Sequence, residues 1–149
     1  MAEKPQQAWW LTLSVEPEHT QLDGKELSSF NASWQKAIYV DDTFIKQNVN
    51  ISNYNEFKSS RFKSSVPLDL NNNKMPETIK VGVYKKKDGN KGIFLSIIEK
   101  DKILKVFTDS TNKGFSTLLL HNHSIRWYKC MNCGNYESIK WNGKAFTIE

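Results

Sequence analysis

The sequence has no long hydrophobic run, and glycine is scarce. The longest apolar stretches extend over only a few residues, as at 93–95, 97–98 and 118–120, whereas a helix needs about 20 apolar residues to cross a bilayer. Only seven glycines occur, and they are scattered among expected turns with no glycine-rich phosphate-binding pattern. We therefore expect neither a membrane-spanning helix nor a phosphate-loop nucleotide site.

Cysteine is rarer still, with only Cys130 and Cys133, which are separated by two residues. No thioredoxin-like βαβ pattern surrounds them, which argues against a redox enzyme. Zinc needs four ligands, and His121 and His123 could supply two beside the two cysteines. We favour a disulfide between the two cysteines, with free thiols or zinc as the alternatives. Because disulfides persist in oxidising compartments, this pairing predicts a periplasmic protein.

The first eight residues are mostly polar and include a proline, so we expect them to be flexible. They contain neither the basic region nor the apolar segment of a signal peptide. The chain is therefore expected to be either cytosolic or the mature form of an exported protein. The cysteine pair favours the second interpretation.

The charge and composition indicate one folded domain over residues 1–149. The hydrophobic share of 38% and the aromatic share of 12% are those of a globular chain. The net charge of +5 raises the question of nucleic-acid binding. However, the densest basic cluster, at 85–91, flanks an Asp-Gly turn and is typical of a solvated hairpin edge. Nucleic acid is therefore not an expected partner, although a cytosolic nucleic-acid binder is a third hypothesis.

Hydrophobic alternation predicts a mainly β fold. Residues 9–16 alternate as a half-buried strand, and Phe30, Trp34 and Ala37 recur at the spacing of a helix over 28–40. From residue 79 onward, short strands are separated by turn signals; we expect them at 79–84, 93–98, 103–108, 115–120, 125–129, 137–141 and 144–148. The expected fold is an antiparallel meander or small sandwich with one N-terminal helix and blade-like hairpins.

Residues 41–65 are less regular and are expected to contain a short helix, loops and one strand. Irregular surface segments commonly carry recognition, and interfaces favour aromatic and arginine anchors. The predicted partner-binding residues come from this segment, from the basic hairpin and from the last strands; they are Tyr54, Phe57, Arg61, Lys85, Lys87 and Tyr136.

A possible calcium loop covers residues 69–77. Its oxygen-bearing side chains are Asp69, Asn71, Asn73 and Glu77, and the backbone carbonyl near Met75 would add another ligand. Lys74 stands where calcium loops usually have glycine, and only two of the side chains are carboxylates. Any calcium binding should therefore be weak, with a dissociation constant of about 10⁻⁴ M or poorer. The alternative is an Asn-rich turn held by side-chain-to-backbone hydrogen bonds.

The sequence around this loop resembles FG-GAP-type repeats, in which a DxDxDG loop leads directly into a β-strand. The match is Asp-Leu-Asn-Asn-Asn-Lys-Met-Pro-Glu followed by Thr-Ile-Lys-Val-Gly-Val-Tyr. Residues 125–133 together with 141–144 also resemble a largely uncharacterised family of small periplasmic proteins of Gram-negative bacteria. These resemblances imply a blade-like hairpin, because a full propeller needs at least four blades.

Fold-level analogy with small envelope proteins suggests a non-catalytic periplasmic binding protein. The favoured hypothesis is an immunity or inhibitor protein that blocks a secreted envelope-targeting toxin, as in bacteria that use type VI secretion. The alternatives are a zinc- or calcium-dependent hydrolase, with its site near His121 and His123, and an accessory protein of envelope assembly. No serine lies in a nucleophile elbow, so we assign no catalytic residue.

Overall fold

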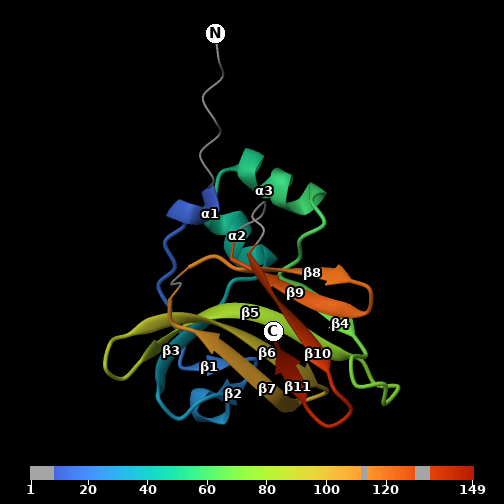
Figure 1. The fold of residues 1–149 in the computed structure, drawn as a ribbon. Coiled ribbons are helices and arrows are strands. Elements are labelled where there is room, and N and C mark those ends of the chain that lie inside the picture. Colours follow the sequence, from blue (N-terminus) through green and yellow to red (C-terminus); the bar gives the residue numbers. More distant parts are fainter. Residues whose placement is uncertain (1–8, 112–113, 130–134) are drawn as a thin grey trace.

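The computed structural model describes residues 9–111, 114–129 and 135–149. Within these ranges, two antiparallel β-sheets face each other, and short helices cover one end (Figure 1). None of the described helices is long and apolar enough to span a membrane. The predicted mainly β fold with minor helical content is confirmed.

The larger sheet has the strand order β3-β5-β6-β7, with β4 also paired to β5. β4 pairs with residues 77–80 of β5 and β3 pairs with residues 82–86, so both lie along the same edge of β5. The strands of this sheet are β3 (Trp34–Tyr39), β4 (Ser65–Leu68), β5 (Glu77–Lys86), β6 (Lys91–Glu99) and β7 (Lys102–Asp109).

The smaller sheet has the order β11-β10-β9-β8. Lys63 connects it to the larger sheet, since its backbone forms two hydrogen bonds of 2.8 Å with Leu118 just before the chain enters β4. The segment 63–68 therefore spans both sheets along one side of the molecule. The strands of the smaller sheet are β8 (Thr117–His121), β9 (Ser124–Tyr128), β10 (Tyr136–Trp141) and β11 (Phe146–Ile148).

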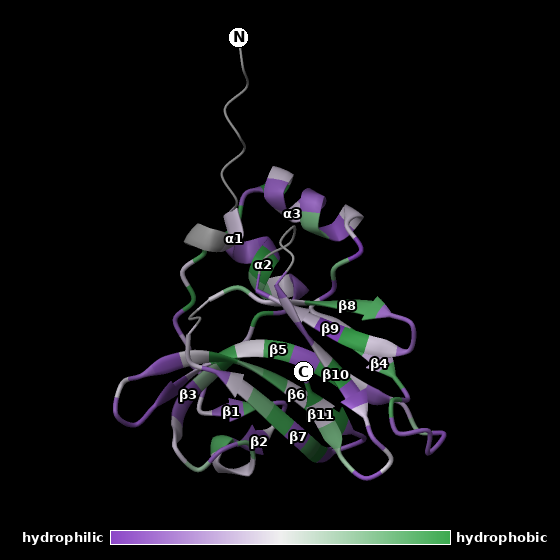
Figure 2. Ribbon diagram, viewed as in Figure 1, coloured by the Kyte–Doolittle hydropathy of each residue, from purple (hydrophilic) through white to green (hydrophobic). Residues whose placement is uncertain are grey.

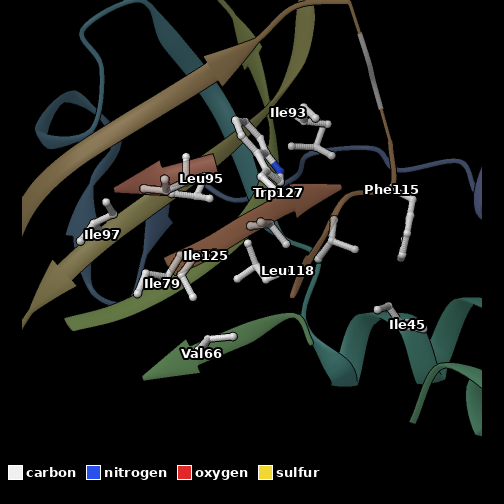
Figure 3. Close-up of a cluster of buried hydrophobic side chains, with 14 of the residues drawn as sticks. Ile45, Val66, Ile79, Ile93, Leu95, Ile97, Phe115, Leu118, Ile125 and Trp127 are labelled. Atoms are coloured by element: carbon white, nitrogen blue, oxygen red, sulfur yellow. The ribbon is translucent and has the colours of Figure 1, made fainter. Parts of the chain in front are cut away.

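The main core lies between the two sheets. Alternate residues of β5 and β6 point toward alternate residues of β8, β9 and β10, as expected for the two-residue period of a strand. Figure 2 shows that hydrophobic residues concentrate in these strands, whereas α3 is largely hydrophilic. Figure 3 shows members of this core, including Ile79, Ile93, Leu95, Ile97, Leu118, Ile125 and Trp127.

The outer side of the larger sheet is buried as well. A two-stranded sheet, β1 (Gln21–Leu22) and β2 (Lys25–Glu26), and the 3₁₀ helix η1 (Leu27–Ser29) contribute Leu22 and Leu27 to a second core. There the Trp34 and Tyr84 rings stack with centroids 5.0 Å apart. Because β6 is covered on both faces, all of residues 93–98 are buried, and all but Ser96 are apolar.

The predicted helix over 28–40 is wrong, because the segment begins in the 3₁₀ helix η1 and continues, from Trp34 to Tyr39, as strand β3. The pairing of β3 with β5 shifts register between Trp34 and Lys36, which inserts one extra residue. Such a bulge places Trp34 and Ala37 on the same buried face although they are three residues apart. The helix-like spacing therefore arises from a bulged strand.

The predicted strand over 9–16 is also wrong. The structure has the short helix α1 (Trp9–Thr12) followed by irregular chain. Trp9 packs against Phe57 and Phe115, with ring centroids 6.3 and 5.0 Å away. The alternating apolar residues therefore do not form a strand here, and Trp9 instead joins an aromatic cluster at the helical end of the sandwich.

Two helices occupy the segment for which one short helix was expected: α2 (Asp42–Asn48) and α3 (Ile51–Ser59). Each begins after a capping side chain. Asp41 accepts a hydrogen bond of 2.9 Å from the Phe44 backbone, and Asn50 accepts one of 2.8 Å from the Asn53 backbone. Such caps satisfy amide groups that have no partner within the helix.

A three-residue ion cluster joins the two sheets at the end of β7. The Lys129 ammonium lies 2.8 Å from an Asp109 carboxylate oxygen and also contacts the Glu137 carboxylate. Burial alone raises the pKa of Asp109, but hydrogen bonds from Lys129 and Thr111 outweigh it and bring the pKa to about 2. The cluster therefore holds the Asp109 carboxylate in its charged form.

Asp109 is expected to make the protein acid-sensitive in a defined range. Its pKa is lowered from 3.8 to about 2 in the folded state, so its stabilisation is present above about pH 4 and is lost as the pH falls toward 2. The loss should reach about 2 kcal/mol. Urea unfolding from about pH 5 to 2 should show this loss in the parent chain and a smaller one in Asp109→Asn. Identical pH profiles for the two proteins would contradict the assignment.

Candidate protein-binding face

The outer face of the smaller sheet carries a cluster of aromatic and basic side chains. In β9, the core residues Ile125 and Trp127 alternate with Arg126 and Tyr128, which therefore face outward. Tyr136 of β10 lies directly opposite Tyr128 in the strand pairing. Phe62, which precedes β4, packs against Tyr128 from the side. We call these four residues, Phe62, Arg126, Tyr128 and Tyr136, the outer-face cluster.

Tyr136 is the exposed member of this cluster, with 38% of its surface accessible. Its ring centroid lies 5.0 Å from that of Tyr128, and the Arg126 guanidinium carbon lies 4.3 Å from the Tyr136 centroid. Tyr128 is buried and meets the Phe62 ring edge-on at 5.1 Å. The Tyr136 side chain is therefore in contact with both an aromatic ring and a cation.

The electrostatics of this face are positive. The outward positions of β8, β9 and β10 carry Arg126 and Lys140 and no described acidic residue. Glu149, which follows β11, offsets the charge of Lys140, since their side chains lie 3.6 Å apart. Arg61 is exposed and adjoins Phe62 in the chain. Since charge complementarity steers association, an acidic partner surface suits this face.

Apart from Arg61, the structure separates the other predicted contact residues from Tyr136. Phe57 is only 1% exposed and packs in the core, so the folded chain does not offer it to a partner. Tyr54 is half-buried on α3, with the Lys46 ammonium 5.9 Å from its ring centroid. Lys85 and Lys87 belong to the β5–β6 hairpin of the larger sheet; Lys85 pairs with Glu16 at 3.8 Å, and Lys87 is exposed.

Sequence reasoning did not identify Phe62, Arg126 or Tyr128. A signal for two of them was present, because Ile125 and Trp127 share one face of a strand and thereby assign Arg126 and Tyr128 to the opposite face. Phe62 gave no comparable signal, since it lies outside any strand and reaches Tyr128 only through the fold.

The predicted calcium loop is held by hydrogen bonds to its own backbone. The two Asp69 carboxylate oxygens accept from the Asn73 and Lys74 amides at 3.2 and 2.9 Å. The Asn71 and Asn73 side chains accept from the Asn73 and Met75 amides at 3.4 and 2.9 Å, respectively. This pattern matches the Asn-rich turn, the alternative to a calcium site.

Glu77, the last predicted ligand, is fully buried at the start of β5. One of its oxygens accepts from the Leu70 and Asn71 amides at 3.0 and 3.2 Å. Burial raises the pKa of Glu77 despite these hydrogen bonds. Glu77 therefore anchors the start of the loop to β5 through hydrogen bonds inside the fold.

Calcium binding by this loop stays a prediction, and thermal unfolding in the presence of the ion tests it. A site with a dissociation constant of about 10⁻⁴ M should stabilise the folded chain by roughly 2 kcal/mol at about 5 mM calcium. Asp69→Ala should abolish that stabilisation, and magnesium at the same concentration is the control. A thermal unfolding midpoint that does not change with calcium would show that the loop is only the Asn-rich turn held by its own hydrogen bonds.

His121 ends β8, and His123 follows it in the turn to β9. Cys130 and Cys133 lie outside the described residues, so the disulfide and the zinc set both remain predictions. Within the residues that the structure describes, no three or more His, Cys, Asp or Glu side chains are placed to hold a metal ion.

Comparison of the chain with family models, with curated proteins and with solved structures finds no match. The interpretation of the outer-face cluster therefore rests on its geometry and chemistry.

Proposed function

We propose that this chain is a protein-binding domain of the inhibitor or immunity kind that blocks an envelope-targeting toxin in the periplasm. The single observation that supports the proposal is the exposed Tyr136 seated on Tyr128 and Arg126. Tyrosine and arginine are, with tryptophan, the residue types enriched at the energetic centres of protein interfaces.

The way in which this cluster is built favours tight association. β9 is hydrogen-bonded on both sides, to β8 and to β10, so the backbone under the cluster is rigid. Contacts with Tyr128 and Arg126 restrict the Tyr136 ring before any partner arrives. Side chains that are ordered in advance lose less entropy on binding. A firm sheet face of this kind is suited to covering the active site of a toxin.

The periplasmic part of the proposal depends on the predicted Cys130–Cys133 disulfide. Mass spectrometry of the natively expressed chain should find both sulfurs oxidised, as expected in that compartment. Two free thiols in that material would remove the basis for this location, while leaving the outer-face cluster itself unaffected.

Site-specific photo-crosslinking tests the binding function. A photoreactive phenylalanine at position 136 should give one covalent adduct with a partner protein in cells. The matched control is the same group at Lys105, an exposed position on β7 of the other sheet, which should give none. Equal labelling from both positions, or none from position 136, would contradict the proposal.

The identified partner then tests the inhibitor role. We expect it to degrade cell-wall or membrane material when purified, and to lose that activity with an equimolar amount of this chain. A partner that belongs to an envelope-assembly machine and is not inhibited would support the accessory role instead. Degradation by this chain alone, lost on chelation, would indicate the hydrolase.

A further inference from the structure

A hollow of about 460 Å³ lies at one end of the smaller sheet. It forms where the loop after β4, the β8–β9 turn and the end of β10 meet. Its walls include Leu70, the turn residues His121, Asn122 and His123, and Lys140 and Trp141 of β10. Small-molecule sites commonly enclose roughly 300–1,000 Å³, so the hollow has room for one sugar ring.

The walls of this hollow favour a negatively charged ligand. Lys140 supplies a positive charge and the two histidines supply ring N–H donors, whereas none of the described lining residues is acidic. The Lys140 ammonium lies 3.6 Å from the Glu149 carboxylate, but both side chains are more than half exposed. Such exposed pairs contribute little, so an anion in the hollow can compete for Lys140.

Trp141 adds an aromatic residue to the walls of the hollow, on the opposite face of β10 from Lys140. Its indole is partly buried and packs against the Phe146 ring, with centroids 4.9 Å apart and planes inclined by 59°. This contact restrains the indole. A large aromatic surface of this kind can pack against the C–H face of a sugar ring while polar neighbours bind its hydroxyl groups.

The β8–β9 turn holds the polar rim in position. Asn122 and His123 both have left-handed backbone conformations, with φ values of 47° and 59°, as a two-residue hairpin turn requires. The Ser124 hydroxyl donates to the His121 carbonyl at 2.6 Å, and the Asn122 amide nitrogen lies 3.2 Å from His121 Nε2. The rim is therefore fixed by local hydrogen bonds.

We propose that this hollow binds a sugar that carries a negative charge, either a carboxylate or a phosphate. Lys140 would pair with the charged group, Trp141 would pack against the ring, and the turn side chains would bind hydroxyls. The proposal goes beyond protein binding and is tested on the isolated chain, so that either proposal can fail while the other stands.

Nuclear magnetic resonance titration of the purified chain tests the sugar site. Glucuronic acid and glucose 6-phosphate are the charged probes, and glucose and inorganic phosphate are the controls. At concentrations up to about 20 mM, at least one charged sugar should shift the Trp141 indole signal and bind about tenfold more tightly than glucose. Lys140→Ala should weaken that binding roughly fivefold, whereas Lys102→Ala, an exposed lysine on β7, should not.

The two charged probes also separate the two sources of charge. Binding of glucuronic acid alone assigns a carboxylated sugar, and binding of glucose 6-phosphate alone assigns a phosphorylated one. The proposal is overturned if glucose binds as tightly as the charged sugars, if inorganic phosphate binds as tightly as glucose 6-phosphate, or if no lining residue responds to either charged sugar. Because Lys140 is exposed, its alanine variant should remain folded and keep the mutational test informative.

Discussion

Replacing Trp127 with alanine should lower the free energy of unfolding by about 3–5 kcal/mol. Trp127 is fully buried between the two sheets, where it is among the largest enclosed side chains (Figure 3). Its indole nitrogen has no hydrogen-bond partner among the described residues, so the loss comes from removed packing and the cavity left behind. Urea unfolding monitored by circular dichroism measures it.

The matched control for this substitution is Ile51→Ala. Ile51 is 66% exposed at the start of α3, so its truncation should change stability by less than about 0.5 kcal/mol. The free energy of unfolding of a folded domain is roughly 5–15 kcal/mol in total. The loss expected for Trp127→Ala is therefore a large share of the stability. If Trp127→Ala costs less than about 1 kcal/mol, the two sheets do not enclose this residue as described.

The second large effect concerns binding of the proposed partner. Tyr136→Ala should weaken the complex by about 2 kcal/mol, roughly thirtyfold, because it removes the exposed anchor of the outer-face cluster. Arg126→Ala should weaken it as well, since it removes the cation that lies 4.3 Å from the Tyr136 ring. Isothermal titration calorimetry with the purified partner, once crosslinking has identified it, measures the affinity of both variants.

Stability must be measured in parallel, because Tyr136 also contacts Tyr128. Its exposure predicts that Tyr136→Ala changes the unfolding free energy by less than about 1 kcal/mol. Lys105→Ala, on the other sheet, is the binding control and should leave the affinity unchanged. Unaltered affinity in Tyr136→Ala and Arg126→Ala would exclude the outer-face cluster as the interface.

The sequence was most informative where hydrophobic alternation coincided with turn residues. The strands after residue 79 were predicted close to their observed positions, because alternate core residues and Asp-Gly or Asn-Gly turns point to the same hairpins. The helix predicted over 28–40 failed because a bulge after Trp34 imitates helical spacing. A bulge depends on the partner strand and leaves no separate signal in its own sequence.

The candidate site was only partly predictable for a related reason. Tyr136 could be proposed as an exposed aromatic residue, but its contact with Tyr128 depends on the register between β9 and β10. Phe57 was proposed for the same chemistry, yet α3 turns it into the core against Trp9 and Phe115. Aromatic residues serve both cores and interfaces, and only the fold separates these roles.

Hydroxyl-radical footprinting of the chain in complex with its partner shows whether the outer-face cluster is the interface. Tyr136 and Ile51 are both exposed in the free chain, on the smaller sheet and at the helical end, respectively (Figure 1). We expect the partner to protect Tyr136 from oxidation and to leave Ile51 as reactive as before. Protection of Ile51 with an unprotected Tyr136 would place the interface on the helices and exclude the outer-face cluster.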